Sequence, residues 1–132
     1  MTVPLTKHEI TEGRANPRIG TALVAETDGM RIWHLRVPPG ETHPPHRHDH
    51  PYFWTVLTDG TARSRFDDGR VVDVTYTNGQ TQHFPDLSPD NAFVHDLINT
   101  GETELVFVTV EFTKEGEHLV KLSIYDYIES TP

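Results

Sequence analysis

Short segments rich in β-branched and aromatic residues recur along this chain, and a turn signal ends almost every one of them. The turns are marked by Asp28-Gly29, Asp59-Gly60, Asp68-Gly69, Asn78-Gly79 and the proline-glycine stretch 37–41. The segments between them are predicted strands: 21–27, 30–37, 52–58, 61–66, 71–77 and 104–112. Turns at intervals of about 8–12 residues, with little helical periodicity, predict an all-β sandwich or barrel.

The length and the even spread of these segments predict a single domain. At 132 residues the chain can bury a core without cross-links. We expect the barrel to span residues 19–114. Residues 1–18 contain two prolines and little pattern, and are expected to form an N-terminal arm that could lie across a neighbouring subunit. Residues 115–132 are predicted to form a last strand or short helix that packs on the barrel or on a partner subunit.

Composition excludes several classes of function. The chain has no cysteine, which excludes disulfides and thiolate metal sites and is consistent with a cytoplasmic location. Its 20 acidic and 11 basic residues give a net charge of −9, which disfavours binding to nucleic acid. No apolar run approaches the roughly 20 residues that span a bilayer, and the N-terminus lacks the apolar core of a signal peptide, so no membrane partner is expected.

Four of the nine histidines lie in one short stretch, ETHPPHRHDHP, at residues 41–51. In an extended segment, residues two apart point to the same face, so His46 and His48 are expected to project together into the barrel. Neutral imidazole is a common ligand for divalent metals. A third ligand must come from elsewhere in the chain, and His95 in FVHDLIN is the best candidate.

These residues make the chain resemble the cupins, whose two motifs occur here in the right order across residues 20–112. The first motif is matched by Gly40, His46, His48 and Gly60, and the second by Gly79, Pro85, His95 and Asn99. The resemblance implies a single-domain jelly-roll β-barrel that is often a homodimer. It also implies a metal inside the barrel, held by His46, His48 and His95.

Two departures from the cupin pattern stand out. The family's glutamate ligand falls at position 53, where this chain has Phe53, and neighbouring Tyr52 supplies no carboxylate either. The interval from Pro85 to His95 is also longer than the motif allows, which predicts an inserted loop at the barrel mouth. A three-histidine site remains, and some cupin oxygenases resemble that version.

Three neutral ligands leave a divalent metal its full charge and two or three open positions, which can take a pair of substrate oxygens and dioxygen. We therefore expect a metal-dependent oxygenase, with Fe(II) as the first choice and Zn, Mn or Ni as alternatives, acting on a small dicarbonyl or carboxylate. A metal-dependent isomerase or hydrolase is a second interpretation. A non-catalytic sensor, storage or small-molecule-binding cupin is a third.

Other residues are weaker candidates for the same site. His50 or His43 could supply a fourth ligand. Candidate pocket residues are Phe53, Trp33, His83, Arg36 and Tyr76. Whichever of Arg36, Arg63 and Arg65 points into the barrel would anchor a substrate carboxylate. Each also has an ordinary structural interpretation, because aromatic residues commonly fill cores and arginines commonly lie on the surface.

Overall fold

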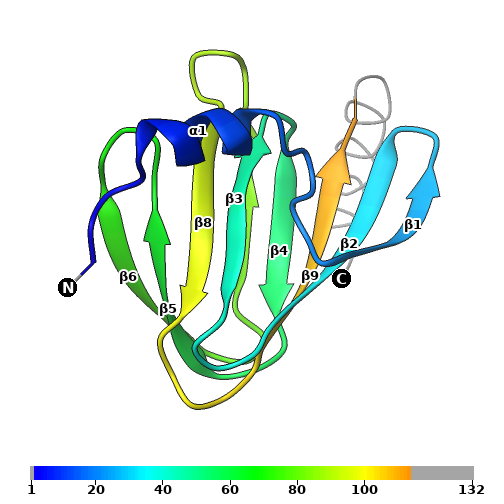
Figure 1. The fold of residues 1–132 in the computed structure, drawn as a ribbon. Helices are drawn as coiled ribbons and strands as arrows, with labels where there is room; N and C mark the ends of the chain where they lie inside the picture. Colours follow the sequence, from blue (N-terminus) through cyan, green and yellow to red (C-terminus); the bar gives the residue numbers. More distant parts are fainter. Residues whose placement is uncertain (1, 114–132) are drawn as a thin grey trace.

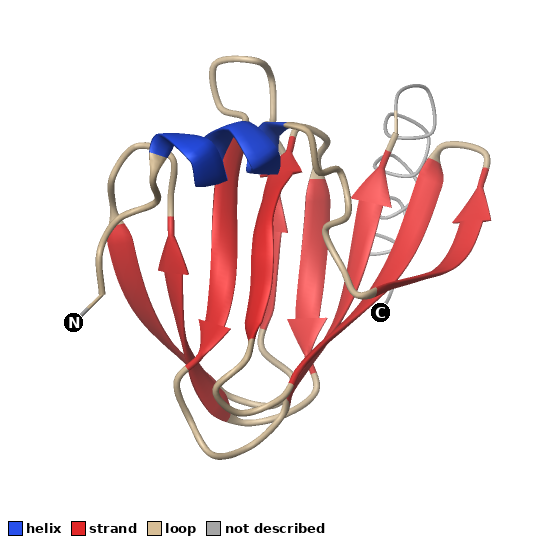
Figure 2. Cartoon of the chain, viewed as in Figure 1, coloured by secondary structure: helices blue, strands red, loops and turns tan. Residues whose placement is uncertain are grey.

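The computed structural model describes residues 2–113, which form two antiparallel β-sheets packed face to face (Figure 1; Figure 2). The five-stranded sheet has the order β1-β2-β9-β4-β7 and the four-stranded sheet the order β3-β8-β5-β6. The predicted all-β barrel is confirmed. The elements are α1 Lys7–Arg14, β1 Ala22–Thr27, β2 Met30–Val37, β3 Thr42–His48, β4 Tyr52–Val56, β5 Gly60–Arg65, β6 Val71–Tyr76, β7 Thr81–Phe84, β8 Phe93–Asn99 and β9 Leu105–Phe112.

Six of these strands follow the sequence pattern, and three do not. The missed strands β3, β7 and β8 are rich in histidine, proline or polar residues, so local β-propensity does not reveal them. Their strand conformation comes from pairing: β3 and β5 flank β8, and β7 pairs with β4. His95 therefore lies within a strand, β8.

The core lies between the two sheets and takes one residue in two from most strands. Along β9, for example, Leu105, Phe107, Thr109 and Glu111 are all buried, with half-buried residues between them. This alternation is the normal pattern for a strand with one face towards a core. The central apolar cluster consists of Leu35, Val37, Val56, Ala62, Tyr76, Leu97, Leu105 and Phe107.

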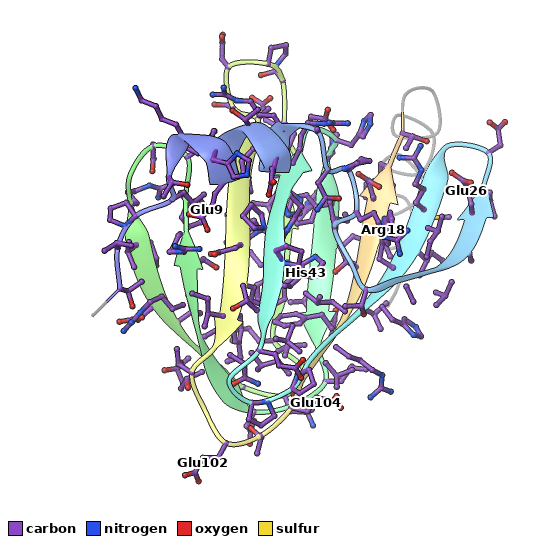
Figure 3. The ribbon with its side chains drawn as sticks, viewed as in Figure 1. Glu9, Arg18, Glu26, His43, Glu102 and Glu104 are labelled. Atoms are coloured by element: carbon purple, nitrogen blue, oxygen red, sulfur yellow. The ribbon has the colours of Figure 1, made fainter. Side chains whose placement is uncertain are left out.

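A β-bulge in β3 changes which of its histidines face inward. The register with β8 shifts between His43 and His46, at the two prolines, which have no N–H to donate to the ladder. Because of this shift, His43, His46 and His48 are all buried although the first two are an odd number of residues apart. Figure 3 labels His43 in the middle of the barrel view, whereas Glu102 lies at the tip of the loop after β8.

The motif positions other than the histidines have structural roles. Gly40 and Gly79 adopt φ angles of 79° and 92°, in the left-handed region where glycine is favoured. Asn99 is almost fully buried, and its side-chain amide donates to the carbonyls of Val37 and Thr103 at 2.8 Å each. These contacts tie the turn after β8 to the end of β2.

The N-terminal arm contains a helix that the sequence analysis missed. Helix α1 begins after a capping box in which Thr6 and Glu9 bond each other's backbone N–H groups. It packs across β3 and β8 of its own chain (Figure 1). The pattern Thr-x-x-Glu at residues 6–9, with Pro17 shortly after the helix end, is the signal that could have revealed it.

A buried ion-pair cluster fastens α1 to the four-stranded sheet. Arg65 donates through its backbone N–H and its Nε to the two carboxylate oxygens of Asp96, at 2.8 and 2.9 Å. Its Nη2 also contacts Glu9 at 2.9 Å, and Asp96 is fully buried. Because every charge in the cluster is paired, the carboxylate of Asp96 is tolerated beneath the helix.

Two boundaries of this description matter for the predictions. Residue 1 and residues 114–132 lie outside the described residues, so the prediction for the C-terminal segment 115–132 stays a prediction. Within residues 2–113, no helix has both the length and the hydropathy needed to cross a bilayer.

Gly13→Ala is expected to destabilise the protein, although alanine is normally the better helix former. A Cβ at Gly13 would lie 2.4 Å from Cγ1 of buried Val94 and 3.0 Å from Cβ of Pro45. Overpacking of this kind costs about 1–3 kcal/mol. Urea unfolding measures the change, with Thr11→Ala at an exposed position of α1 as the matched control. A Gly13→Ala protein as stable as the control would contradict the close packing of α1.

Candidate metal centre

Three imidazole rings from two strands converge inside the barrel. His46 and His48 come from β3, and His95 comes from β8 directly opposite His46 in the strand register. The Nε2 atoms of His46 and His48 lie 3.0 Å apart, and those of His48 and His95 lie 3.1 Å apart. The predicted convergence of these histidines is therefore confirmed, and together they could hold a metal ion.

The spacing of the three nitrogens fits a single divalent ion. A metal–imidazole bond is about 2.0–2.1 Å long, so two ligands at a near-right angle are separated by about 3.0 Å. The observed separations of 3.0 and 3.1 Å agree with that value. His46 also lies with its Nδ1 2.8 Å from the carbonyl oxygen of Pro44, so donation of the Nδ1 proton leaves the Nε2 lone pair facing the other two rings.

Burial keeps these rings neutral and ready to bind a cation. It lowers the pKa values of His46 and His48 well below the ordinary value, and neighbouring histidines lower them further by charge repulsion. Burial likewise lowers the pKa of His95 to about 3 and that of His43 to about 4. At neutral pH the lone pairs are therefore free of protons, as metal ligation requires.

The three histidines line a cavity of about 50 Å³, which is room for a few water-sized groups. Within the part of the chain that the structure describes, no Lys, Arg, Asp or Glu lines this cavity. Apart from the histidines, its wall is made of Ile19, Leu35, Tyr52, Trp54, Tyr76, Leu97, Phe107 and Thr109. A charged ligand in this cavity would thus meet no opposite charge from a lining side chain.

Of the five predicted pocket residues, Tyr76 lines this cavity and Trp33 does not. Tyr76 is buried, and its ring meets those of Trp54 and Phe107 edge to face. Trp33 is also buried and faces inward, but its Nε1–H donates to Glu111 at 3.1 Å, away from the cavity wall. Trp33 is accordingly a core residue here.

Phe53, His83 and Arg36 lie on the outer face of the five-stranded sheet, which corrects their assignment to the pocket. Phe53 pairs with His83 across β4 and β7, and the pleat turns both away from the cavity that Tyr52 and Trp54 line. Arg36 is exposed and forms an ion pair with Glu104 at 3.1 Å. It is therefore not an anchor for a ligand in the barrel.

The position of the family's glutamate also shifts by one residue. Position 52, and not position 53, faces the histidines: Tyr52 lines the cavity, whereas Phe53 does not. The ring of Tyr52 stacks on His48 with centroids 4.2 Å apart and planes 20° apart. Burial raises the pKa of Tyr52, so the phenol stays protonated and adds no negative charge to the centre.

Neither candidate for a fourth ligand joins the three-histidine group. The ring centroid of His43 lies 4.6 Å from that of His46, but His43 is not among the histidines whose ligand atoms converge. Its Nε2 has no hydrogen-bond partner among the described residues. His50 lies instead with Asp49 and Glu111, where the three potential ligand atoms are within 4.8 Å of one another. Arginines already contact both carboxylates of that second group, Arg47 at 2.7 Å and Arg31 at 3.5 Å.

A two-sheet β-barrel with converging histidines on two strands of one sheet defines the class of this protein. Residues 33–111 match the family model of the cupin domain, and the chain belongs to the cupin family.

Solved structures with the same fold come from several bacteria. A cupin domain from Bordetella pertussis Tohama I is 25% identical with a TM-score of 0.62, over 77% of this chain and 100% of that one. A conserved protein with a double-stranded β-helix domain from Klebsiella pneumoniae is 22% identical with a TM-score of 0.56, over 81% and 89%. A cupin 2 conserved barrel domain protein from Salinispora arenicola is 14% identical with a TM-score of 0.54, over 93% and 98%. No curated protein sequence matches this chain.

Purified protein is expected to bind close to one divalent ion per chain, because three neutral imidazoles converge on a single point. An ion that binds only the folded state raises stability by about 2.7 kcal/mol at a hundred times its dissociation constant. Metal analysis and thermal unfolding with added Zn²⁺ or Co²⁺ measure both effects.

Variants at the three ligands define the site. His46→Ala and His95→Ala should lose the ion, whereas His50→Ala, which lies outside the group, should retain it. Loss of metal in His50→Ala alone would place the centre at Asp49, His50 and Glu111 instead.

Metal-free protein is expected to lose stability as the pH falls below about 6.5. The folded chain holds the pKa of His43 near 4 and that of His95 near 3, whereas the unfolded chain has ordinary histidine values. Because the unfolded state takes up protons first, stability is fully present above pH 6.5 and falls by about 1.4 kcal/mol per pH unit for each such group. Urea unfolding of EDTA-treated protein at several pH values measures the slope.

The control for this pH dependence compares a buried with an exposed histidine. His43→Gln should reduce the slope by one proton, and His34→Gln, at an exposed position of β2, should leave it unchanged. A free energy of unfolding that stays constant from about pH 7 to about pH 5 would be incompatible with lowered pKa values at His43, His46, His48 and His95.

Proposed function

We propose that the protein is a metal-dependent oxygenase that acts on a small dicarbonyl compound bound as its enolate, or on a similarly small carboxylate. The observation that carries this proposal is the convergence of three neutral histidines in a small cavity that no Lys, Arg, Asp or Glu of residues 2–113 lines. When bound, the divalent ion, Fe(II) by preference, supplies a Lewis acid with open positions for substrate oxygens and dioxygen.

The charge of the site favours a substrate whose negative charge lies on the oxygens that bind the ion. Three imidazoles do not reduce the charge of a divalent ion, and neither Arg nor Lys among residues 2–113 lines the cavity. A negative charge shared by two oxygens that both bind the ion therefore meets positive charge directly, whereas a further negative group held away from the ion would face an apolar wall without a partner. An enolate of a 1,3-dicarbonyl compound has this charge and this pair of oxygens.

The remaining walls shape and dry the site. Leu35, Leu97 and Phe107 present apolar surface, which excludes water from the reacting atoms and accepts short alkyl substituents. Burial raises the pKa of Tyr76 to about 12, so its hydroxyl stays protonated and can donate a hydrogen bond to a substrate oxygen. The size of the cavity restricts the substrate to a few heavy atoms beyond its two oxygens.

Oxygen consumption tests this function directly. Protein reconstituted with Fe(II) is expected to consume oxygen with small β-diketones and more slowly, or not at all, with 2-oxo acids and catechols. His46→Ala should abolish the reaction because it removes a ligand, whereas Arg36→Ala should retain it because Arg36 lies on the outer face. Silence across the panel with iron bound would overturn the oxygenase proposal.

A non-catalytic binding module is the second candidate, and one observation favours it. The residue that faces the histidines near the position of the family's glutamate is Tyr52, and no carboxylate from the described residues lines the cavity to act as a general base. This feature also weighs against an isomerase or hydrolase, which needs a group to move protons. A β-diketone that binds the metal-loaded protein, shifts its melting temperature and is recovered unchanged would support this second function.

A further inference from the structure

The rings of His48 and His95 are surrounded by other aromatic rings. His48 stacks on Tyr52 at a centroid distance of 4.2 Å and on Phe93 at 5.0 Å, with interplanar angles of 20° and 29°. His95 contacts Phe66 at 5.2 Å and Phe93, edge to face, at 5.2 Å. Contacts of these geometries favour a particular orientation of each ring.

Hydrogen bonding orients only one of the three candidate ligands. His46 has the Pro44 carbonyl oxygen 2.8 Å from its Nδ1. The Nδ1 atoms of His48 and His95 are buried, and neither has a hydrogen-bond partner within residues 2–113. Metal-binding histidines almost always donate this proton to a carboxylate, a carbonyl or water, which fixes the ring and raises its basicity.

We propose that Tyr52 and Phe93 are positioning residues for the metal centre, and that stacking on His48 and edge-to-face contact with His95 orient these two rings in place of hydrogen bonds. This inference rests on the metal site of the proposed function but does not require the oxygenase reaction. Tyr52 and Phe93 act through the histidines, because neither side chain binds the ion itself. Phe93 has no ligand atom, and burial keeps the phenol of Tyr52 protonated at neutral pH.

The backbone register holds the aromatic rings where this role needs them. Phe93 is the cross-strand neighbour of His48, and Phe66 forms an isolated bridge with His95. Tyr52 is in turn stacked on Phe84, with centroids 4.6 Å apart and planes 11° apart. The stack therefore runs from β7 through β4 and β3 to β8, and it connects the two sheets at the site.

The arrangement has a chemical consequence for a bound ion. A histidine whose Nδ1–H has no acceptor is a weaker electron donor than one that is hydrogen-bonded. Two such ligands leave the ion more electron-poor, which strengthens its attraction for an anionic enolate. The stacking rings would thus set both the geometry and the Lewis acidity of the centre.

Leucine substitutions separate stacking from general packing. Phe93→Leu keeps an apolar side chain and removes the ring, and Phe112→Leu makes the same change at a buried position on β9 away from the three histidines. We expect Phe93→Leu to weaken Co²⁺ binding about tenfold or more and to change the visible spectrum of the bound ion. Phe112→Leu should lose comparable stability but keep the wild-type affinity and spectrum. Wild-type affinity and spectrum in Phe93→Leu would overturn the proposal.

Conservative variants of Tyr52 distinguish its ring from its hydroxyl. Tyr52→Phe keeps the stacking ring and should restore the Co²⁺ affinity and spectrum that Tyr52→Leu loses. Equal weakening in Tyr52→Phe and Tyr52→Leu would show that the hydroxyl acts, and would overturn the stacking role of this residue.

A measurement on the unaltered protein covers the case in which a variant does not fold. Proton–nitrogen-15 correlation NMR of the Zn²⁺-loaded protein resolves the ring N–H signal of each histidine. The Nδ1 proton of His46 should show the downfield shift of a hydrogen-bonded imidazole, and those of His48 and His95 should not. Three equally downfield protons would overturn the proposal, while a failed oxygen assay with normal Co²⁺ binding would count against the oxygenase function alone.

Discussion

The pairing of β3 with β8 is the constraint on which the site depends. Antiparallel pairing places His46 opposite His95 and His48 opposite Phe93, so two distant segments deliver their rings to one point. The separation of the rings is fixed by backbone hydrogen bonds between strands about 4.8 Å apart, not by flexible loops. A site built on paired strands holds its ligands more closely than one built on loops, and the remaining features of the barrel act on that fixed arrangement.

Burial of the histidines has opposing effects on stability and function. Removing the rings from water lowers their pKa values and so keeps them unprotonated and able to bind a cation. The same burial leaves ring nitrogens of His43, His48 and His95 without hydrogen-bond partners among the described residues. Each unpaired buried polar atom costs about 1–3 kcal/mol. A group of buried polar atoms without hydrogen-bond partners is typical of a functional site, where some stability is lost in favour of chemistry.

Sequence periodicity predicted the parts of the site that depend on local geometry and missed those that depend on pairing. The period of two residues correctly placed His46 and His48 on the inner face. It could not reveal the bulge at Pro44-Pro45 that turns His43 inward, because the bulge is defined only against β8. Phe53 was assigned to the pocket in place of Trp54 because a shift of one residue reverses the face of every side chain in a strand. Helix α1 was missed although its capping box is local, because the helix is short and its stability comes from packing on β3 and β8.

Two neighbouring residues fix the register of β8, because one side chain needs an apolar cavity and the other needs a charged partner. His95 faces the apolar cavity, while Asp96 faces α1 and is fully buried in a cluster with Arg65 and Glu9. A slip of one residue would place the carboxylate of Asp96 in a cavity that no Lys or Arg of residues 2–113 lines, and would leave Arg65 without its buried partner. An unpaired buried charge costs several kcal/mol, which is a large fraction of the stability of a domain of this size. The ion pair beneath the helix therefore does more than attach α1: it fixes the strand position at which the third histidine enters the barrel.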